Sequence, residues 1–178
     1  DGFLDPNEWT AKTVETQPDG NENIYYTNAL GQTILSVYKD TTTEQQWETF
    51  TEYNAAGQAI LVADPSAVTG FDESYPDLGV PPAGSEDTSY LSTDSGQITT
   101  TTYAASTTAT TSLPGDVTGY QTSTAIQQGI DGTPILQTSE TYIESPAGTF
   151  VQATSTQYRN DDGTGLETTT YTYTWQGS

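Results

Sequence analysis

Oxygen-bearing side chains recur at alternate positions near the beginning of the sequence. The stretch "DGNEN" places Asp19, Asn21 and Asn23 two residues apart, as at the start of an EF-hand calcium loop. The sixth position, where an EF-hand needs Gly, is Ile24, and the twelfth, where it needs Glu, is Leu30. An EF-hand is therefore excluded. A hairpin turn is the simpler interpretation of these residues, and a calcium site of another kind is the alternative.

Catalytic chemistry has little support in the sequence. There is no His and no Cys, so Ser-His and Cys-His nucleophile arrangements are excluded. A Ser-Lys arrangement would need Lys12 or Lys39, and neither lies in a recognisable motif. The 24 Asp and Glu residues would form carboxylate pairs by chance alone, so such pairs do not indicate a glycosidase. We therefore expect a protein that is not an enzyme and that has no cofactor.

An aromatic row lies near the end of the sequence, in "LETTTYTYTWQ". There, Tyr171, Tyr173 and Trp175 alternate with Thr residues, which predicts a strand with the aromatic rings on one face. Exposed, these rings would form a platform on which sugars stack. A chain this poor in Leu and Val needs aromatic side chains in its core, so the row is expected to be buried.

The charge balance restricts the partners of the chain. The net charge is −21, with only three Lys and Arg residues. Such a charge argues against binding nucleic acid or anionic lipid, because both are themselves negative. Acidic surfaces of this kind keep secreted proteins soluble, which agrees with an expected extracellular or cell-surface location. Because the sequence begins without Met or a leader segment, we expect a piece of a longer or processed chain. The longest apolar run, 59–63, is too short to span a membrane.

The residue pattern predicts an all-β fold. Thr is abundant, 12 residues are Tyr, and no segment has the apolar spacing of a long helix. Further strands are predicted at 97–104 and 149–158. The chain is divided into a leading strand and turn (1–23), two closely similar hairpins (24–64), a surface loop rich in Pro, Gly and acidic residues (65–90) and divergent hairpins (91–178).

A repeated unit begins at a Gly that follows a polar stretch and precedes a β-rich run. The first two copies are the closest: Tyr26, Asn28 and Gly31 recur as Tyr53, Asn54 and Gly57. In the full set, the aligned glycines are Gly31, Gly57, Gly96, Gly132, Gly148 and Gly165. Each unit is interpreted as a β-hairpin whose Gly supplies a positive φ. Since an isolated hairpin is marginally stable, several must join into one sheet.

These two copies resemble the YD repeat of the RHS family, whose unit reads roughly Tyr-Asp-x-x-Gly-Arg, then a Leu/Ile-rich strand and often a closing Asp. Asp40 and Asp64 match the closing position. The motif Asp is Asn in both copies, and the Arg after Gly is Gln. The resemblance covers most of residues 24–178, and the family's terminal core segment has no match.

The resemblance implies stacked hairpins forming an extended or spiralling antiparallel sheet, as in the wall of a hollow shell. The expected function is a structural segment of a large secreted or cell-surface protein, forming shell wall or a self-associating filament. Its partners would be sheet edges of other copies, neighbouring repeats of a longer chain, or an enclosed cargo. The alternative is a carbohydrate-binding or adhesive β-module, which predicts an exposed aromatic row and a surface glycan as ligand.

Overall fold

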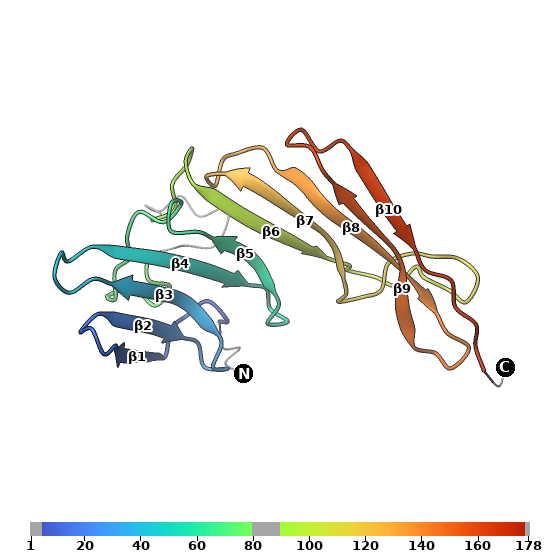
Figure 1. Cartoon of the computed structure of the whole chain (residues 1–178). Coiled ribbons are helices and arrows are strands. Elements are labelled where there is room, and N and C mark those ends of the chain that lie inside the picture. The colour runs from blue at the N-terminus through green and yellow to red at the C-terminus, as the bar shows by residue number, and fades with distance from the viewer. Residues whose placement is uncertain (1–4, 80–89, 177–178) are drawn as a thin grey trace. The chain divides into compact units, whose positions relative to one another are not determined.

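The computed structural model describes residues 5–79 and 90–176. Ten strands follow one another in chain order in one open antiparallel sheet, each beside the next, and the described residues contain no helix (Figure 1). The all-β hairpin architecture is therefore confirmed. The strands are β1 (Ala11–Thr16), β2 (Glu22–Thr27), β3 (Thr33–Lys39), β4 (Gln46–Tyr53), β5 (Ala59–Ala63), β6 (Gln97–Tyr103), β7 (Gln121–Gln128), β8 (Ile135–Glu144), β9 (Phe150–Tyr158) and β10 (Leu166–Thr170). The strands predicted at 97–104 and 149–158 are β6 and β9.

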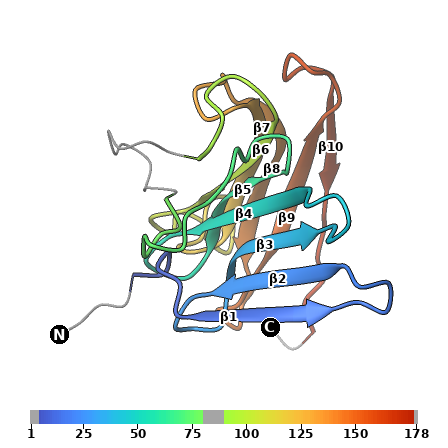
Figure 2. The ribbon, with the colours of Figure 1, turned by 90° about the vertical axis from the view of Figure 1, so that its left-hand side faces the viewer.

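The chain forms two compact units, and this division differs from the segments expected from composition. Unit 1 comprises Asp1–Thr99 with Gln127–Thr133, and unit 2 comprises Thr100–Ile126 with Pro134–Ser178. Strands β1–β5 belong wholly to unit 1 and lie side by side (Figure 2). Strands β8–β10 belong wholly to unit 2.

The core of unit 1 lies on one face of its sheet, as period-two patterning requires. A row of directly opposed residues crosses four strands, from Tyr26 through Leu35 and Phe50 to Ala63, and each is at most 1% exposed. The next row pairs Ile24 with Val37. Ile34, the extra residue at an irregularity between β2 and β3, is also fully buried. The other side chains that alternate with the core rows are polar or partly exposed, so β2–β5 are amphipathic strands of a sheet packed on one side.

A covering segment, defined as residues 65–79 and 90–96, packs on this apolar face. Its Ala67, Val68, Leu78 and Leu91 belong to the same buried cluster as the sheet residues. The region was expected to be a surface loop because it is rich in Pro, Gly and acidic residues. Instead, the described part supplies a second layer, whose two parts are joined by an isolated bridge between Val68 and Leu91. Residues 80–89 of that loop lie outside the described residues.

Unit 2 has a much smaller core. Its buried cluster consists of Ala109, Val117 and Tyr142, with Phe150 packed against it. The last strand, β10, ends at Thr170, although the alternating pattern predicted a strand through Trp175. Every residue of β10 is exposed.

Candidate functional site

The two closely similar repeats form the same turn, built by an Asn side chain. In the first copy, the Oδ1 of Asn28 accepts hydrogen bonds from the amides of Leu30 and Gln32 at 3.0 and 2.9 Å. Its Nδ2 donates to Oε1 of Gln32 at 3.1 Å. In addition, Gly31 donates to the Asn28 carbonyl and has a φ of 78°. The Asn thus satisfies the turn's own backbone groups.

The second copy repeats this network. The Oδ1 of Asn54 accepts from the amides of Ala56 and Gln58, both at 3.0 Å, and its Nδ2 donates to Oε1 of Gln58 at 3.0 Å. Gly57 has a φ of 75°. The copies are also connected, because Nε2 of Gln32 donates to the Gly57 carbonyl at 2.8 Å. The motif residues Asn28, Gly31, Asn54 and Gly57 are therefore a paired structural site.

Five turns share this frame. In each, the first residue's amide donates to the carbonyl of the fifth, and the fourth, a Gly with positive φ, donates back to the first. They span 17–21, 28–32, 54–58, 145–149 and 160–164. The sequence alignment found Gly31, Gly57 and Gly148 but missed Gly20. It also placed the last copy on Gly165 rather than Gly163, because both have a β-rich run after them.

Three of the six aligned glycines, Gly96, Gly132 and Gly165, are not the fourth residue of such a turn. Gly132 has no positive φ, so the prediction for it was wrong. Gly96 has a φ of 76°, as predicted, but it serves a different purpose. A Cβ at this position would lie 2.2 Å from the amide nitrogen of Ala67 and from the carbonyl group of Ser66. Gly96 therefore permits close contact with the backbone of the covering segment.

The two motif tyrosines are not equivalent. Counted back from the turn Asn, Tyr53 stands where Thr27 stands in the first copy, and Tyr26 is one residue further away. Tyr26 is fully buried within the core cluster, whereas Tyr53 is half-buried and packs against the outside of the same cluster. The hydroxyl of Tyr53 donates to the Thr33 carbonyl at 2.9 Å. The sequence alignment of Tyr26 with Tyr53 was thus wrong by one residue.

Tyr26 is the centre of a polar clasp between the sheet and the covering segment. Its hydroxyl donates to Oε1 of Glu73 at 2.7 Å, and Nζ of Lys12 lies 2.6 Å from the same oxygen. The rings of Trp9 and Phe71 pack on Tyr26 with centroids 5.6 and 5.4 Å away. Burial, with the bond to Glu73, raises the pKa of Tyr26, and the bonds from Lys12 and Tyr26 lower the pKa of Glu73. Oε1 of Glu73 thus accepts from both Tyr26 and Lys12, and these contacts fix the covering segment on the sheet.

The residues before β1 connect both repeat turns, a role that the sequence did not indicate. Asn7 bonds the backbone of Tyr53 twice, with Nδ2 to the carbonyl at 2.9 Å and Oδ1 to the amide at 2.7 Å. The Pro6 carbonyl accepts from Nδ2 of Asn28 at 2.7 Å. The signal in the sequence is only a short "DPN" before a Trp, which is too common a pattern to be interpreted.

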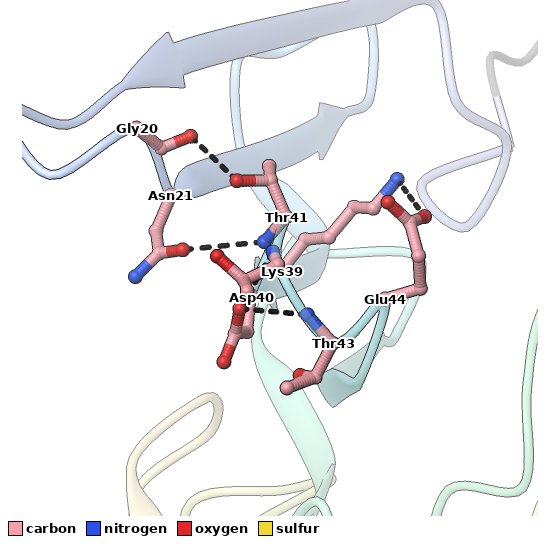
Figure 3. A network of polar contacts seen from close by, with 8 residues as sticks. Gly20, Asn21, Lys39, Asp40, Thr41, Thr43 and Glu44 are labelled. Carbon is pink, nitrogen blue, oxygen red and sulfur yellow. Dashed lines mark hydrogen bonds and ion pairs between the residues drawn. The ribbon is translucent and has the colours of Figure 1, made fainter.

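The structure does not bring the three calcium candidates together. The carboxylate of Asp19 accepts from the amide and from Nδ2 of Asn21, at 3.0 Å each. In Figure 3 the Asn21 Oδ1 accepts from the Thr41 amide at 3.2 Å, which joins this turn to the next one. Asn23 lies on β2, where its Nδ2 donates to Glu15 at 3.1 Å. These contacts match the turn interpretation.

The neighbouring turn in Figure 3 has its own oxygen network. Oδ1 of Asp40 accepts from the amides of Thr42 and Thr43 at 2.8 and 3.1 Å, which lowers the pKa of Asp40. Lys39 pairs with Glu44 at 2.7 Å. Nowhere in the part of the chain that the structure describes do three Asp or Glu side chains gather as a metal site would need.

The aromatic row is exposed, so the expectation that it is buried was wrong. Tyr171, Tyr173 and Trp175 are 41%, 38% and 37% exposed, and the last two rings stack with centroids 5.3 Å apart. The hydroxyl of Tyr173 donates to the Gln152 carbonyl at 2.7 Å. The row therefore follows β10 and bonds to the backbone of β9, with more than a third of each side chain exposed.

Comparisons with sequence models of known families, with curated proteins and with solved structures found no match. Among the described residues there is no helix of the length and apolar character needed to cross a membrane.

Proposed function

We propose that this chain is a structural segment of a large secreted or cell-surface protein of the RHS/YD type. Its function is structural: its sheet edges pair with strands of other repeats or other copies, which extends a β-sheet wall or scaffold. The observation that carries the proposal is the combination of one repeated turn with strands in simple chain order. Each hairpin adds two strands without a crossover, so the architecture can be lengthened indefinitely.

The turn chemistry supports the family assignment. The family motif has Asp at the turn and Arg after Gly, whereas this chain has Asn and Gln at both positions in both close copies. These side chains contact each other directly, Asn28 with Gln32 and Asn54 with Gln58. A neutral amide pair thus stands where the motif would place an acid and a base. The paired replacement keeps the contact while adding no charge.

The edge strand β1 supports association through backbone pairing. The Gln17 amide donates to the Asn21 carbonyl at 2.7 Å, which sets the alternation of bonded and non-bonded pairs between β1 and β2. It follows that the backbone groups of Lys12, Val14 and Thr16 point away from β2. All six residues of β1 are exposed, as is all of β10 at the other end of the strand order. Unpaired edges of this kind accept further strands.

Val14→Lys tests this association. Lysine on an edge strand opposes strand addition because pairing would desolvate its charge. We expect the unmodified chain to form assemblies that grow with concentration in light scattering, and Val14→Lys to abolish them. The matched control is Leu30→Lys, which adds the same charge at an exposed turn, and it should still assemble. Equal behaviour of the two variants, or a chain that is monomeric at every concentration, would contradict the proposal.

A second function, binding of a surface glycan, is favoured by the exposure of the aromatic row. Partly exposed, stacked aromatic rings suit the apolar faces of sugar rings. We expect Trp175→Ala to lose most of the signal on a glycan array. Trp47→Ala is the control, because Trp47 is similarly exposed at 43% but lies in unit 1. An array without binding by the unmodified chain, or equal loss in both variants, would exclude this function.

A further inference from the structure

One face of the sheet in unit 2 has no charged residue. The pairing register identifies its members, because directly opposed residues share a face and neighbours along a strand alternate. The centre is two rows of hydroxyl side chains. The neutral face consists of Ser123, Ser139, Thr141, Thr154, Thr156, Thr168 and Thr170, with Ile143 and Val151 at one end and Tyr158 and Leu166 at the other.

The acidic residues of the same strands lie on the opposite face. Glu140 is opposed to Ser155, Glu144 to Phe150 and Glu167 to Gln157, and all six residues alternate with the neutral face. Charge is therefore segregated within strands β7–β10 of a chain whose net charge is −21. Two such chains repel each other unless they meet where neither has a charge.

The hydroxyl groups of the neutral face are largely bonded to one another. Thr156 and Thr168 share a hydrogen bond of 2.9 Å, and Thr141 and Thr154 share one of 2.8 Å. Ser139 also lies 3.2 Å from the Tyr158 hydroxyl. A hydroxyl that already shares a hydrogen bond costs less to remove from water than one without a partner, but each pair has two O–H groups and one shared bond, so one O–H per pair still needs an acceptor. The face can thus be covered at low polar cost by a neutral surface that offers acceptors, such as a second set of hydroxyl groups.

Unit 2 also lacks the buried area that a sheet of this size needs. Its core cluster consists of three buried residues with one more ring packed against it. The residues of the neutral face within β7–β9 are only partly exposed, and those of β10 are exposed. Tyr142 and Phe150 of the small cluster lie on the acidic face, so a second layer on the neutral face would add burial that this cluster does not supply.

We infer that the neutral face packs against the same face of a second copy of this chain. The contact is sheet on sheet and two-fold symmetric, because one self-complementary surface meets its own equivalent. A copy of the chain fits because every part of the interface is uncharged on both sides. This association is closed and gives dimers, whereas pairing through β1 and β10 is open and gives growing assemblies. The inference does not depend on the proposed function.

The test uses the full chain carrying Val14→Lys, which removes growth through the edge and leaves unit 2 unchanged. Sedimentation velocity over a range of concentrations should show a monomer–dimer equilibrium. Adding Thr156→Glu places a charge at the centre of the neutral face. Each of the two copies would then bury one unpaired carboxylate in the interface, which should weaken dimerisation by about 100-fold or more. Gln157→Glu adds the same charge one residue later, on the opposite face, and should leave the dimer intact.

The outcomes separate this inference from edge pairing. Circular dichroism and thermal melting establish that both Glu variants are folded. Loss of the dimer with Thr156→Glu alone supports the inference. Salt at 0.5 M should strengthen the dimerisation of the Val14→Lys chain, because it screens the repulsion between acidic residues. Dimers that persist with Thr156→Glu, equal weakening by Gln157→Glu, or a parent that stays monomeric overturn it. If the unmodified chain forms growing assemblies but the Val14→Lys chain is a monomer, the proposal of edge pairing is retained and the present inference is rejected.

Discussion

Replacing Gly96 by alanine is expected to destabilise unit 1 by about 3–5 kcal/mol. Two effects add. The residue has a φ of 76°, which disfavours a side chain, and the new Cβ would lie 2.2 Å from the backbone of Ser66 and Ala67. Backbone atoms cannot swing aside as a flexible side chain can, so the covering segment must move. Backbone hydrogen bonds of the covering segment, such as the one that the Ala67 amide donates to the Asp64 carbonyl at 2.8 Å, would be strained.

Gly31→Ala is the matched control for this experiment. Gly31 has nearly the same φ, 78°, but a Cβ there would meet nothing within 4 Å. Only the backbone strain remains, so a loss of about 1–2 kcal/mol is expected. Urea unfolding followed by Trp fluorescence, in a chain carrying Trp175→Phe, reports on unit 1 alone, because Trp9 and Trp47 both lie in it. Equal losses for the two variants would show that the close approach at Gly96 is unimportant.

Tyr26→Ala is expected to cost about 3–5 kcal/mol, the range for truncating a buried aromatic side chain. Tyr26 is fully buried, and its ring contacts Trp9 and Phe71. The substitution also removes the hydroxyl that donates to Glu73. Tyr25→Ala is the control, because this neighbour faces the other side of the sheet and is half-exposed. The same unfolding measurement should place its loss well below that of Tyr26→Ala, and similar losses would contradict the assignment of the core face.

The clasp adds a pH dependence with a definite sign. The pKa of Glu73 is lowered in the folded state, chiefly by the hydrogen bond from Lys12 and then by that from Tyr26. A group with a depressed pKa contributes stability above its unfolded value and loses that contribution as the pH falls through the folded value. The difference in stability between the unmodified chain and Glu73→Gln should therefore be largest at neutral pH and disappear in acid. A difference that stays constant in acid would show that Glu73 acts only by packing.

Local patterns predicted the strands and the two close turns. Alternation of apolar and polar residues gave the amphipathic faces of β2–β5, and the Asn-x-x-Gly spacing gave the turns at Asn28 and Asn54. These features depend on neighbours in the sequence, so periodicity reveals them. Matching residue types placed Tyr26 and Tyr53 at equivalent positions, although they are offset by one residue relative to the turn Asn. Residue type alone does not show this offset.

The features that the sequence did not predict depend on contacts between distant segments. The covering segment looks like a surface loop because its apolar residues have no regular period. Glu73 was indistinguishable from the other acidic residues until the fold placed it beside Lys12 and Tyr26. The row at Tyr171, Tyr173 and Trp175 was assigned to the core from composition, but more than a third of each of these side chains is exposed. Only the three-dimensional arrangement shows which aromatic residues have a second layer available.

The strand order also determines how the protein can acquire its structure. Every strand pairs with the strand next to it in the chain, so most contacts close short loops and cost little chain entropy. Hairpins such as β2–β3 and β4–β5 can therefore form on the ribosome as soon as their turns emerge. The clasp is an exception, because Lys12 and Tyr26 must wait for Glu73. During synthesis the apolar face of unit 1 is thus protected only after the hairpins that form it have emerged, and until then it is a surface that a chaperone can bind.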